Sequence, residues 1–137
     1  MSIMILEKLF NPKSVAVVGA TPKEGKVGRV ILENFTKKYN GRIYPVNPGY
    51  NEIFGLKCYR SVSELPEAPD LLVVAIPASS VLTVIREAAV KGVHAAIVIS
   101  GGFKETGMSE GEKLERELEE ISRKYGIRIL GPNCLGV

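Results

Sequence analysis

Apolar residues fall in five short runs along the chain, separated by longer stretches that mix apolar and polar positions. The runs cover residues 14–19, 42–46, 70–77, 94–100 and 127–131. Each is rich in Val, Ile, Leu or Ala with few polar interruptions, which is typical of strands buried on both faces of a parallel sheet. We therefore predict five parallel strands.

Three of the intervening stretches place apolar residues on one side of a helix. Their apolar positions are Val27, Val30, Ile31 and Phe35 in the first, Val81, Leu82, Ile85, Ala88 and Ala89 in the second, and Leu114, Leu118, Ile121 and Tyr125 in the third. Ser79 or Ser80 can cap the second helix, and Ser109 begins a capping-box pattern for the third. Gly92 and Gly126 mark where these two helices should end.

Strands that alternate with helices predict an α/β fold with an open, doubly wound, Rossmann-like parallel sheet of about five strands. Helices should cover both faces, and residues 50–67 should hold only short elements. We expect the strand order 3-2-1-4-5, numbered along the chain. At 137 residues the chain has the length of a single domain, residues 1–137.

Composition narrows the possible partners. The formal net charge is only +3, basic residues are scattered among acids, and Trp is absent, so nothing indicates nucleic-acid binding. The longest apolar runs are far shorter than a membrane span of ~20 residues, and no secretory signal is visible. We expect a cytoplasmic protein with no membrane partner. The sequence contains no Gln, which agrees with a thermophilic source.

The sequence offers little chemistry for catalysis or metal binding. Its single histidine, His94, begins the fourth predicted strand and so lies at the edge opposite to the strand ends. The two cysteines, Cys58 and Cys134, are far apart and have no neighbouring ligands, so we expect free thiols. Ser100 is not in a nucleophile-elbow motif. We find no general acid–base pair and no metal site.

The turns that follow the predicted strands share one chemical character. They contain small residues, prolines and amide side chains, and in a parallel sheet they gather at the carboxyl edge, where ligands bind. The turn residues are Gly19, Ala20, Thr21, Pro22 and Lys23 after the first strand, Asn47, Pro48 and Tyr50 after the second, Ile76, Pro77 and Ala78 after the third, Ser100, Gly101 and Gly102 after the fourth, and Asn133 after the fifth.

The first of these turns has the features of a phosphate-binding loop. Small residues let the backbone approach a phosphate, and the helix that starts near Val27 and Gly28 presents free amide groups with the positive end of its dipole. Lys23 and Lys26 add positive charge. The alternative is that Gly19 and Gly28 only permit a tight turn and close packing of the helix on the strand.

A dinucleotide site is a weaker interpretation of the same loop. That site needs the spacing G-x-G-x-x-G and an acidic residue about 20 positions later. Here Gly19 is followed by Ala-Thr-Pro, and the second strand ends at Asn47 instead of Asp or Glu. The ribose of NAD would lose its usual acceptor.

Several segments together resemble one family. The segments NPKSVAVVGAT, YPVNP, AIPA, VISGGF and RILGPNCLGV resemble the coenzyme A-binding domain of ADP-forming acyl-CoA synthetases, which is similar to the N-terminal domain of the succinyl-CoA synthetase alpha subunit. The resemblance spans nearly the whole chain and implies coenzyme A (CoA) as the nucleotide. It is what favours CoA over other nucleotides.

The resemblance also implies roles for the turn residues. The first turn with Val27 and Gly28 would hold the CoA phosphates, and Asn47, Pro48 and Tyr50 would flank the adenosine. Residues 76–78 would support the adenine or pantetheine, and residues 100–102 with Asn133 would line the path of the pantetheine. The chain departs from the succinyl type at Pro22-Lys23, at Tyr50, where that type has a lysine, and at Gly101, where it has a glutamate.

Members of this family convert acyl-CoA, ADP and phosphate to acid, CoA and ATP through a phosphohistidine. That histidine and the ATP-grasp domain belong to further domains or subunits, so the resemblance implies them as partners and implies no turnover by this chain alone. Two alternatives remain: a stand-alone CoA-binding carrier or regulatory protein, and an NAD(P)-binding domain. A homo-oligomer is possible.

Overall fold

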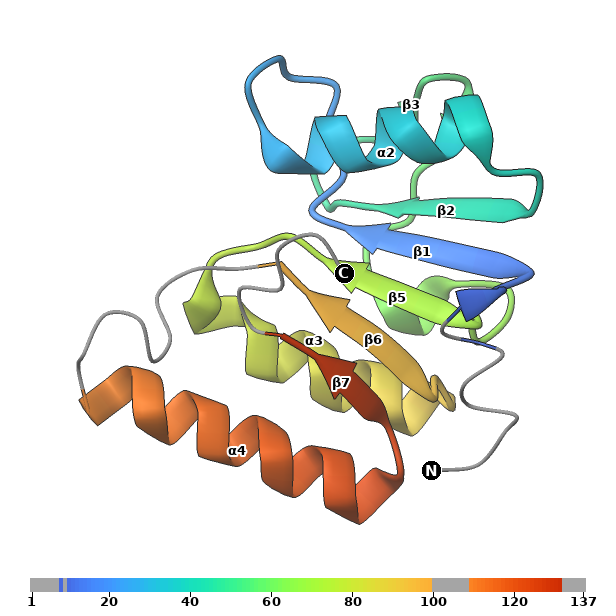
Figure 1. Ribbon diagram of the computed structural model, residues 1–137. Helices are drawn as coiled ribbons and strands as arrows, with labels where there is room; N and C mark the ends of the chain where they lie inside the picture. Colours follow the sequence, from blue (N-terminus) through green and yellow to red (C-terminus); the bar gives the residue numbers. More distant parts are fainter. Residues whose placement is uncertain (1–7, 9, 100–108, 132–137) are drawn as a thin grey trace.

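The computed structural model describes residue 8, residues 10–99 and residues 109–131 (Figure 1). Five parallel strands form the main sheet: β1 (Ser14–Val18), β2 (Arg42–Val46), β5 (Leu71–Val74), β6 (Ala95–Val98) and β7 (Arg128–Leu130). The helices are α2 (Val27–Lys38), α3 (Ala78–Lys91) and α4 (Ser109–Tyr125). The predicted α/β class and all five strands are confirmed.

The order of the strands differs from the prediction. The sheet runs β2-β1-β5-β6-β7, so the third strand along the chain, β5, pairs with β1 and not with β2. The outer edge of β2 is instead covered by Tyr59, whose amide donates to Pro45 O at 3.0 Å and whose carbonyl accepts from Asn47 N at 2.9 Å. The predicted order 3-2-1-4-5 is therefore wrong.

The segment between β2 and β5 contains the short elements that the sequence predicted. They are a hairpin of β3 (Glu52–Ile53) and β4 (Leu56–Lys57) and a 3-10 turn, η1 (Val62–Glu64). The hairpin brings Ile53 and Cys58 into the core beside α2, and η1 brings Val62 into the core beside α3.

Both faces of the sheet are covered, as predicted. Ala16 and Val18 of β1 belong to the core that packs against α3 and α4, whereas Val15 and Val17 belong to the core that includes Leu32 of α2. Figure 1 shows α2 on one side of the sheet and α3 and α4 on the other. The alternation of side chains along β1 thus supplies both cores, and the strand is completely buried.

Two details of the helices differ from the sequence prediction. Val27 and Val30 are each 53% exposed, because α2 packs on the sheet through Gly28 and Leu32. In α3 neither Ser79 nor Ser80 is the cap: Pro77 is the N-cap, in an extended conformation. The predicted end of α3 is confirmed, since Gly92 has a left-handed φ of +102°.

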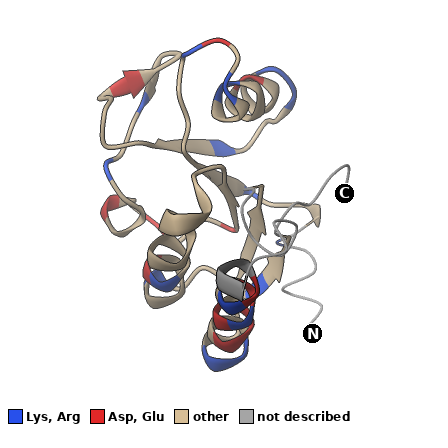
Figure 2. Cartoon of the chain, turned by 90° about the vertical axis from the view of Figure 1, so that its left-hand side faces the viewer, with Lys and Arg blue, Asp and Glu red and all other residues tan. Residues whose placement is uncertain are grey.

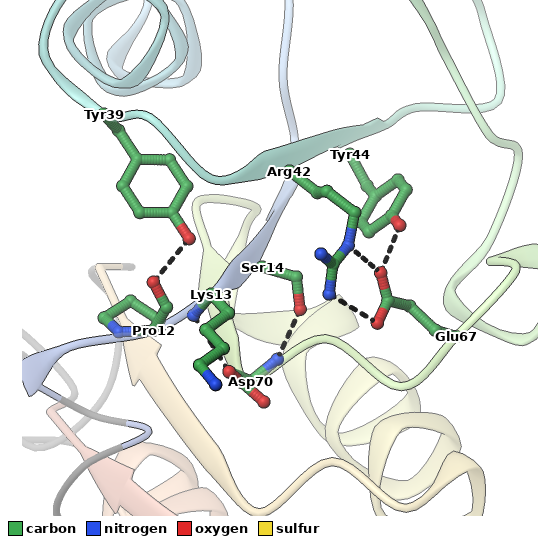
Figure 3. Close-up of polar contacts among 8 residues, drawn as sticks. All are labelled: Pro12, Lys13, Ser14, Tyr39, Arg42, Tyr44, Glu67 and Asp70. Carbon is green, nitrogen blue, oxygen red and sulfur yellow. Dashed lines mark hydrogen bonds and ion pairs between the residues drawn. The ribbon is translucent and has the colours of Figure 1, made fainter.

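A polar cluster closes the amino edge of the sheet (Figure 3). Arg42 of β2 donates two hydrogen bonds to Glu67, at 2.6 and 3.1 Å, and the hydroxyl of Tyr44 donates a third. Asp70 accepts from Lys13 N at 2.9 Å, and Ser14 Oγ accepts from Asp70 N at 3.0 Å. The protein's own groups therefore join β1, β2 and the start of β5 at this edge.

We expect Glu67→Gln to remove part of the pH dependence of stability. Hydrogen bonds from Arg42, and then from Tyr44, hold the pKa of Glu67 below its ordinary value of 4.5. A carboxyl with a lowered folded-state pKa stabilises the fold above its unfolded pKa, and this contribution is lost as the pH falls through the folded value.

The measurement is the melting temperature between neutral pH and about pH 3. The wild type should lose more stability below pH 4.5 than the Glu67→Gln variant, by a modest amount because the pair is partly exposed. Glu52→Gln, at an exposed position on β3, is the matched control. Equal curves for the wild type and Glu67→Gln would contradict the expectation.

Candidate functional site

Two adjoining cavities open at the carboxyl edge of β1, β2 and β5. One, of about 590 Å³, lies toward α2 and is called here the α2 groove; the other, of about 400 Å³, lies toward α3 and η1 and is called the α3 cavity. Both are lined by Gly19, Asn47, Ile76 and Pro77. The cavities lie at the carboxyl ends of β1 and β5, and the order in which the chain adds strands to the sheet reverses between these two strands. Ligands usually bind at this point in such folds.

The turn after β1 depends on two glycines that allow close backbone approach. Gly19 has φ +92°, and a Cβ there would lie 2.1 Å from Ala75 O. A Cβ on Gly28 would lie 1.9 Å from Gly19 O. Any side chain at either position would force the turn, the start of α2 and the end of β5 apart. The structure therefore uses both glycines for packing, and both also line the α2 groove.

The start of α2 is suited to an anion. Its N-cap is Lys26, which makes no side-chain cap bond, and its first turn contains no acidic residue. Amide groups at a helix start and the positive end of the dipole attract phosphate. Thr21, Lys23 and Lys26 line the same groove, and both lysines are exposed.

The loop between β1 and α2 is held by contacts within itself and by Arg29. Thr21 Oγ1 accepts from Lys23 N at 3.2 Å, and Arg29 donates to Pro22 O. The Arg29 guanidinium also pairs with Glu33 at 3.4 Å and lies 5.2 Å from the ring centroid of Phe54 at the hairpin tip. Arg29 thus ties the loop to α2 and the hairpin, a role that the sequence analysis missed.

Asn47 connects the turns after β1 and β2. Its Nδ2 donates to Ala20 O at 2.9 Å, and its Oδ1 accepts from Gly49 N at 2.8 Å. Its backbone carbonyl accepts from Tyr50 N at 3.4 Å. Both functions of the amide are used, so aspartate could not replace it without losing the donor. Asn47 therefore fixes the boundary between the α2 groove and the α3 cavity.

The α3 cavity is largely apolar. Its walls are Val18 and Val46 from the strands, Val62 from η1, and Ile76 and Val84 from the segment that leads into and along α3. Its polar lining residues are Arg60, Ser61, Ser80 and Glu87, in addition to Asn47. A flat, partly polar ring fits such a site, where apolar walls supply contact and a few polar groups fix orientation.

The structure brings together most of the residues that the sequence assigned to the site. Those that line one or both cavities are Gly19, Thr21, Lys23, Val27, Gly28, Asn47, Pro48, Tyr50, Ile76 and Pro77. Three others are close but line neither cavity: Ala20 is fully buried, Pro22 accepts from Arg29, and Ala78 packs on the core. Ser100, Gly101, Gly102 and Asn133 lie outside the described residues.

Several lining residues were not predicted. They are Gly49 and Ala75 in the α2 groove, and Val18, Val46, Arg60, Ser61, Val62, Ser80, Val84 and Glu87 in the α3 cavity. Residues 60–62 precede or begin η1 and follow no predicted strand. The rule that ligands bind at the turns after strands therefore could not identify these residues. Ser80 and Val84 lie on α3, where the sequence analysis considered only the core-facing side and the cap.

Nothing in the described residues forms a catalytic constellation. His94 precedes β6, and its carbonyl accepts from Arg128 N at 2.8 Å at the edge opposite to the cavities. Cys58 is a buried free thiol whose pKa is raised by burial, so it stays protonated. Among the described residues there is no group of His, Cys, Asp and Glu that could hold a metal ion, and no helix long and apolar enough to cross a membrane.

Comparison with known families decides which group of proteins this site belongs to. A family described as the CoA binding domain matches residues 13–137. The chain belongs to this CoA binding domain family. The match covers the β1–α2 loop, both cavities and the whole main sheet.

Relatives of this CoA binding domain are found in much longer proteins. The ADP-forming acetate–CoA ligase I of Archaeoglobus fulgidus is 51% identical over 96% of this chain, which covers 19% of that ligase. A second similar protein is the dinucleotide-forming acetyl-coenzyme A synthetase 1 of Ca. Korarchaeum cryptofilum, whose structure was solved in complex with phosphate and ADP. The two structures have a TM-score of 0.89 and 45% sequence identity, and the match covers 96% of this chain and 28% of the synthetase chain. The chain thus spans less than a third of either relative.

One relative is a protein of similar length. A conserved hypothetical protein of Pyrococcus furiosus has 34% identity and a TM-score of 0.70 over 89% of this chain, and the match covers 95% of that protein. The same fold therefore occurs as a small protein as well as within large ligases.

Proposed function

We propose that this domain binds CoA with the phosphates in the α2 groove. The observation that carries the proposal is the start of α2, which has no side-chain cap bond and lines the groove at Lys26, Val27 and Gly28. Lys23 and Lys26 add charge opposite to that of the phosphates. Thr21 supplies a hydroxyl at the same groove.

The α3 cavity is the proposed place of the adenine ring. Its apolar walls and its position beyond Asn47 and Pro48 suit a flat base attached to the phosphates through ribose. Ile76 and Pro77 face both cavities and would support the junction. The pantetheine would leave toward Ser100–Gly102 and Asn133, as the family resemblance implies.

Titration calorimetry with CoA, NAD and NADP tests the choice of ligand. We expect CoA to bind more tightly than either dinucleotide, because Asn47 stands where a dinucleotide site has an acidic ribose acceptor and its amide is already used by Ala20 O and Gly49 N. Tighter binding of NAD than of CoA would overturn the proposal.

Removal of both lysines at the groove is expected to weaken CoA binding about 3- to 10-fold, because each exposed charge contributes modestly. The double variant Lys23→Met/Lys26→Met should also show a smaller effect of salt on affinity than the wild type. The control is Lys37→Met/Lys38→Met, which removes the same charge at the far end of α2. Equal losses in the two variants would show that only net charge matters.

We further propose that the domain serves an ADP-forming acid–CoA ligase in the cytoplasm. In this role it would present CoA to a phosphohistidine domain and an ATP-grasp domain, which complete the conversion of acyl-CoA, ADP and phosphate to acid, CoA and ATP. The 51% identity to an acetate–CoA ligase supports this role. The isolated chain should form no ADP from ATP, acetate and CoA, and turnover by the chain alone would contradict it.

A stand-alone CoA carrier or regulator is the second candidate. The small Pyrococcus protein supports it, since that protein matches this domain over 95% of its length. An antibody raised against the domain distinguishes the two candidates in a lysate of the native cells. A band several times longer than 137 residues, or co-purification with ligase subunits, supports the ligase; a band of this size alone supports the carrier.

A further inference from the structure

One wall of the α3 cavity is attached to the helix that forms the opposite wall. Arg60, Ser61 and Val62 line the cavity from the segment leading into η1, while Val84 and Glu87 line it from α3. The width of the cavity therefore depends on how η1 is held against α3. The side chain of Val62 is buried in the core and anchors η1 there. This burial does not pair the polar groups of residues 60–65 with α3.

Glu87 binds the beginning of η1. Its Oε1 accepts from the backbone amide of Val62 at 3.3 Å, and its Oε2 accepts from the hydroxyl of Ser63. The residue at the N-cap of η1, Ser61, makes no side-chain cap bond. The carboxylate of Glu87 on α3 therefore accepts the amide hydrogen bond at the start of η1 that a local N-cap side chain would otherwise accept.

Lys91 binds the end of η1 one helical turn farther along α3. Its Nζ donates to Leu65 O at 2.7 Å and to Ser63 O at 3.2 Å. Residues four apart on a helix lie on the same side, so Glu87 and Lys91 form a pair that holds both ends of the turn. Lys91 does not line the cavity and can affect a ligand only through η1.

We infer that Glu87 and Lys91 are positioning residues that hold η1 at the distance from α3 required by the adenine end of CoA. The inference rests on the proposed function, since it assigns the α3 cavity to adenine. This positioning role can be distinguished from a general role in stability. The proposed phosphate contacts lie in the α2 groove, on the other side of Asn47, and none of the residues that line that groove belongs to η1. Loss of the pair should therefore affect the adenine end and spare the phosphate end.

The test compares two probes, CoA and inorganic pyrophosphate, by NMR titration and calorimetry. Lys91→Met should weaken CoA binding about 5- to 10-fold, which matches the modest net contribution of an ordinary hydrogen bond, and leave pyrophosphate binding unchanged. Lys91→Arg, which keeps the donors, should restore most of the CoA affinity. Lys113→Met, at an exposed position on α4, is the matched control and should behave like the wild type.

Three results would overturn the inference. They are unchanged CoA affinity in folded Lys91→Met, equal loss of CoA and pyrophosphate binding, and failure of Lys91→Arg to restore affinity. If Lys91→Met does not fold, Ser63→Ala removes one contact of Glu87 at an exposed position, and it should weaken CoA binding alone. A wild type that binds no CoA would instead reject the proposed function.

Discussion

Replacement of Gly28 by alanine is expected to weaken CoA binding at least about 10-fold and to lower the free energy of unfolding by about 1–3 kcal/mol, the usual cost of overpacking. Gly28 is buried at the start of α2, and a Cβ would lie 1.9 Å from Gly19 O. The helix must move away from the turn after β1, and its free amide groups move with it. Chemical denaturation and calorimetry measure the two effects.

Gly25→Ala is the matched control for this substitution. Gly25 lies in the same loop, but a Cβ there has nothing within 4 Å. Its φ of +82° makes alanine unfavourable by about 1–2 kcal/mol, so stability should fall without crowding the groove. Gly25→Ala should therefore bind CoA nearly as the wild type does. Wild-type affinity in Gly28→Ala would remove the start of α2 from the site.

Asn47→Asp is expected to weaken CoA binding about 10-fold or more, because it places a negative charge between the two cavities that would hold the phosphates and the base. The change is isosteric, so it adds no bulk. It also replaces the donor that reaches Ala20 O at 2.9 Å by a second acceptor, which loosens the link between the turns after β1 and β2.

The control for this variant is Asn51→Asp, which adds the same charge at an exposed position that lines neither cavity. It should bind CoA within about twofold of the wild type, since an exposed charge outside both cavities is screened by solvent. The NAD alternative makes the opposite prediction for Asn47→Asp, because an acid at this strand end would accept from the ribose. A gain in NAD affinity with unchanged CoA affinity would favour that alternative.

The sequence predicts the central strands β1, β5 and β6 well because they are buried on both faces. A run such as residues 71–74 must be apolar throughout, and no tertiary detail changes that. The order of the strands is different, since it depends on which segment occupies the edge of β2. Tyr59 fills that edge through two backbone hydrogen bonds, and nothing in its residue type indicates this.

The candidate site is predictable only where it consists of turns after strands. The turns at Gly19, Asn47 and Pro77 could be placed at one edge from the sequence, and the structure brings them together. The wall formed by residues 60–62 could not be predicted, because it depends on side chains of α3 that are far away in sequence. The exposure of Val27 also depended on packing, since Gly28 takes the position against β1.

The distribution of charged residues agrees with the proposed CoA site. Figure 2 looks onto the carboxyl edge of the sheet and shows that Lys, Arg, Asp and Glu are dense on α4, where both signs mix. The walls of the α3 cavity are largely apolar, and the lysines of the β1–α2 loop are exposed beside the groove. We therefore expect CoA binding to depend more on a few groups at defined positions in the two cavities than on the net charge of the domain.

The most direct test of the CoA site is a map of backbone amide shifts during titration of the ¹⁵N-labelled chain with CoA. We predict the largest shifts at Gly19, Thr21 and Gly28 of the α2 groove and at Asn47 and Ser80, with little change at the opposite edge. Shifts centred on Ser14, Arg42 and Asp70, or no saturable shifts at all, would contradict the assignment of CoA to the paired cavities between β1 and β5.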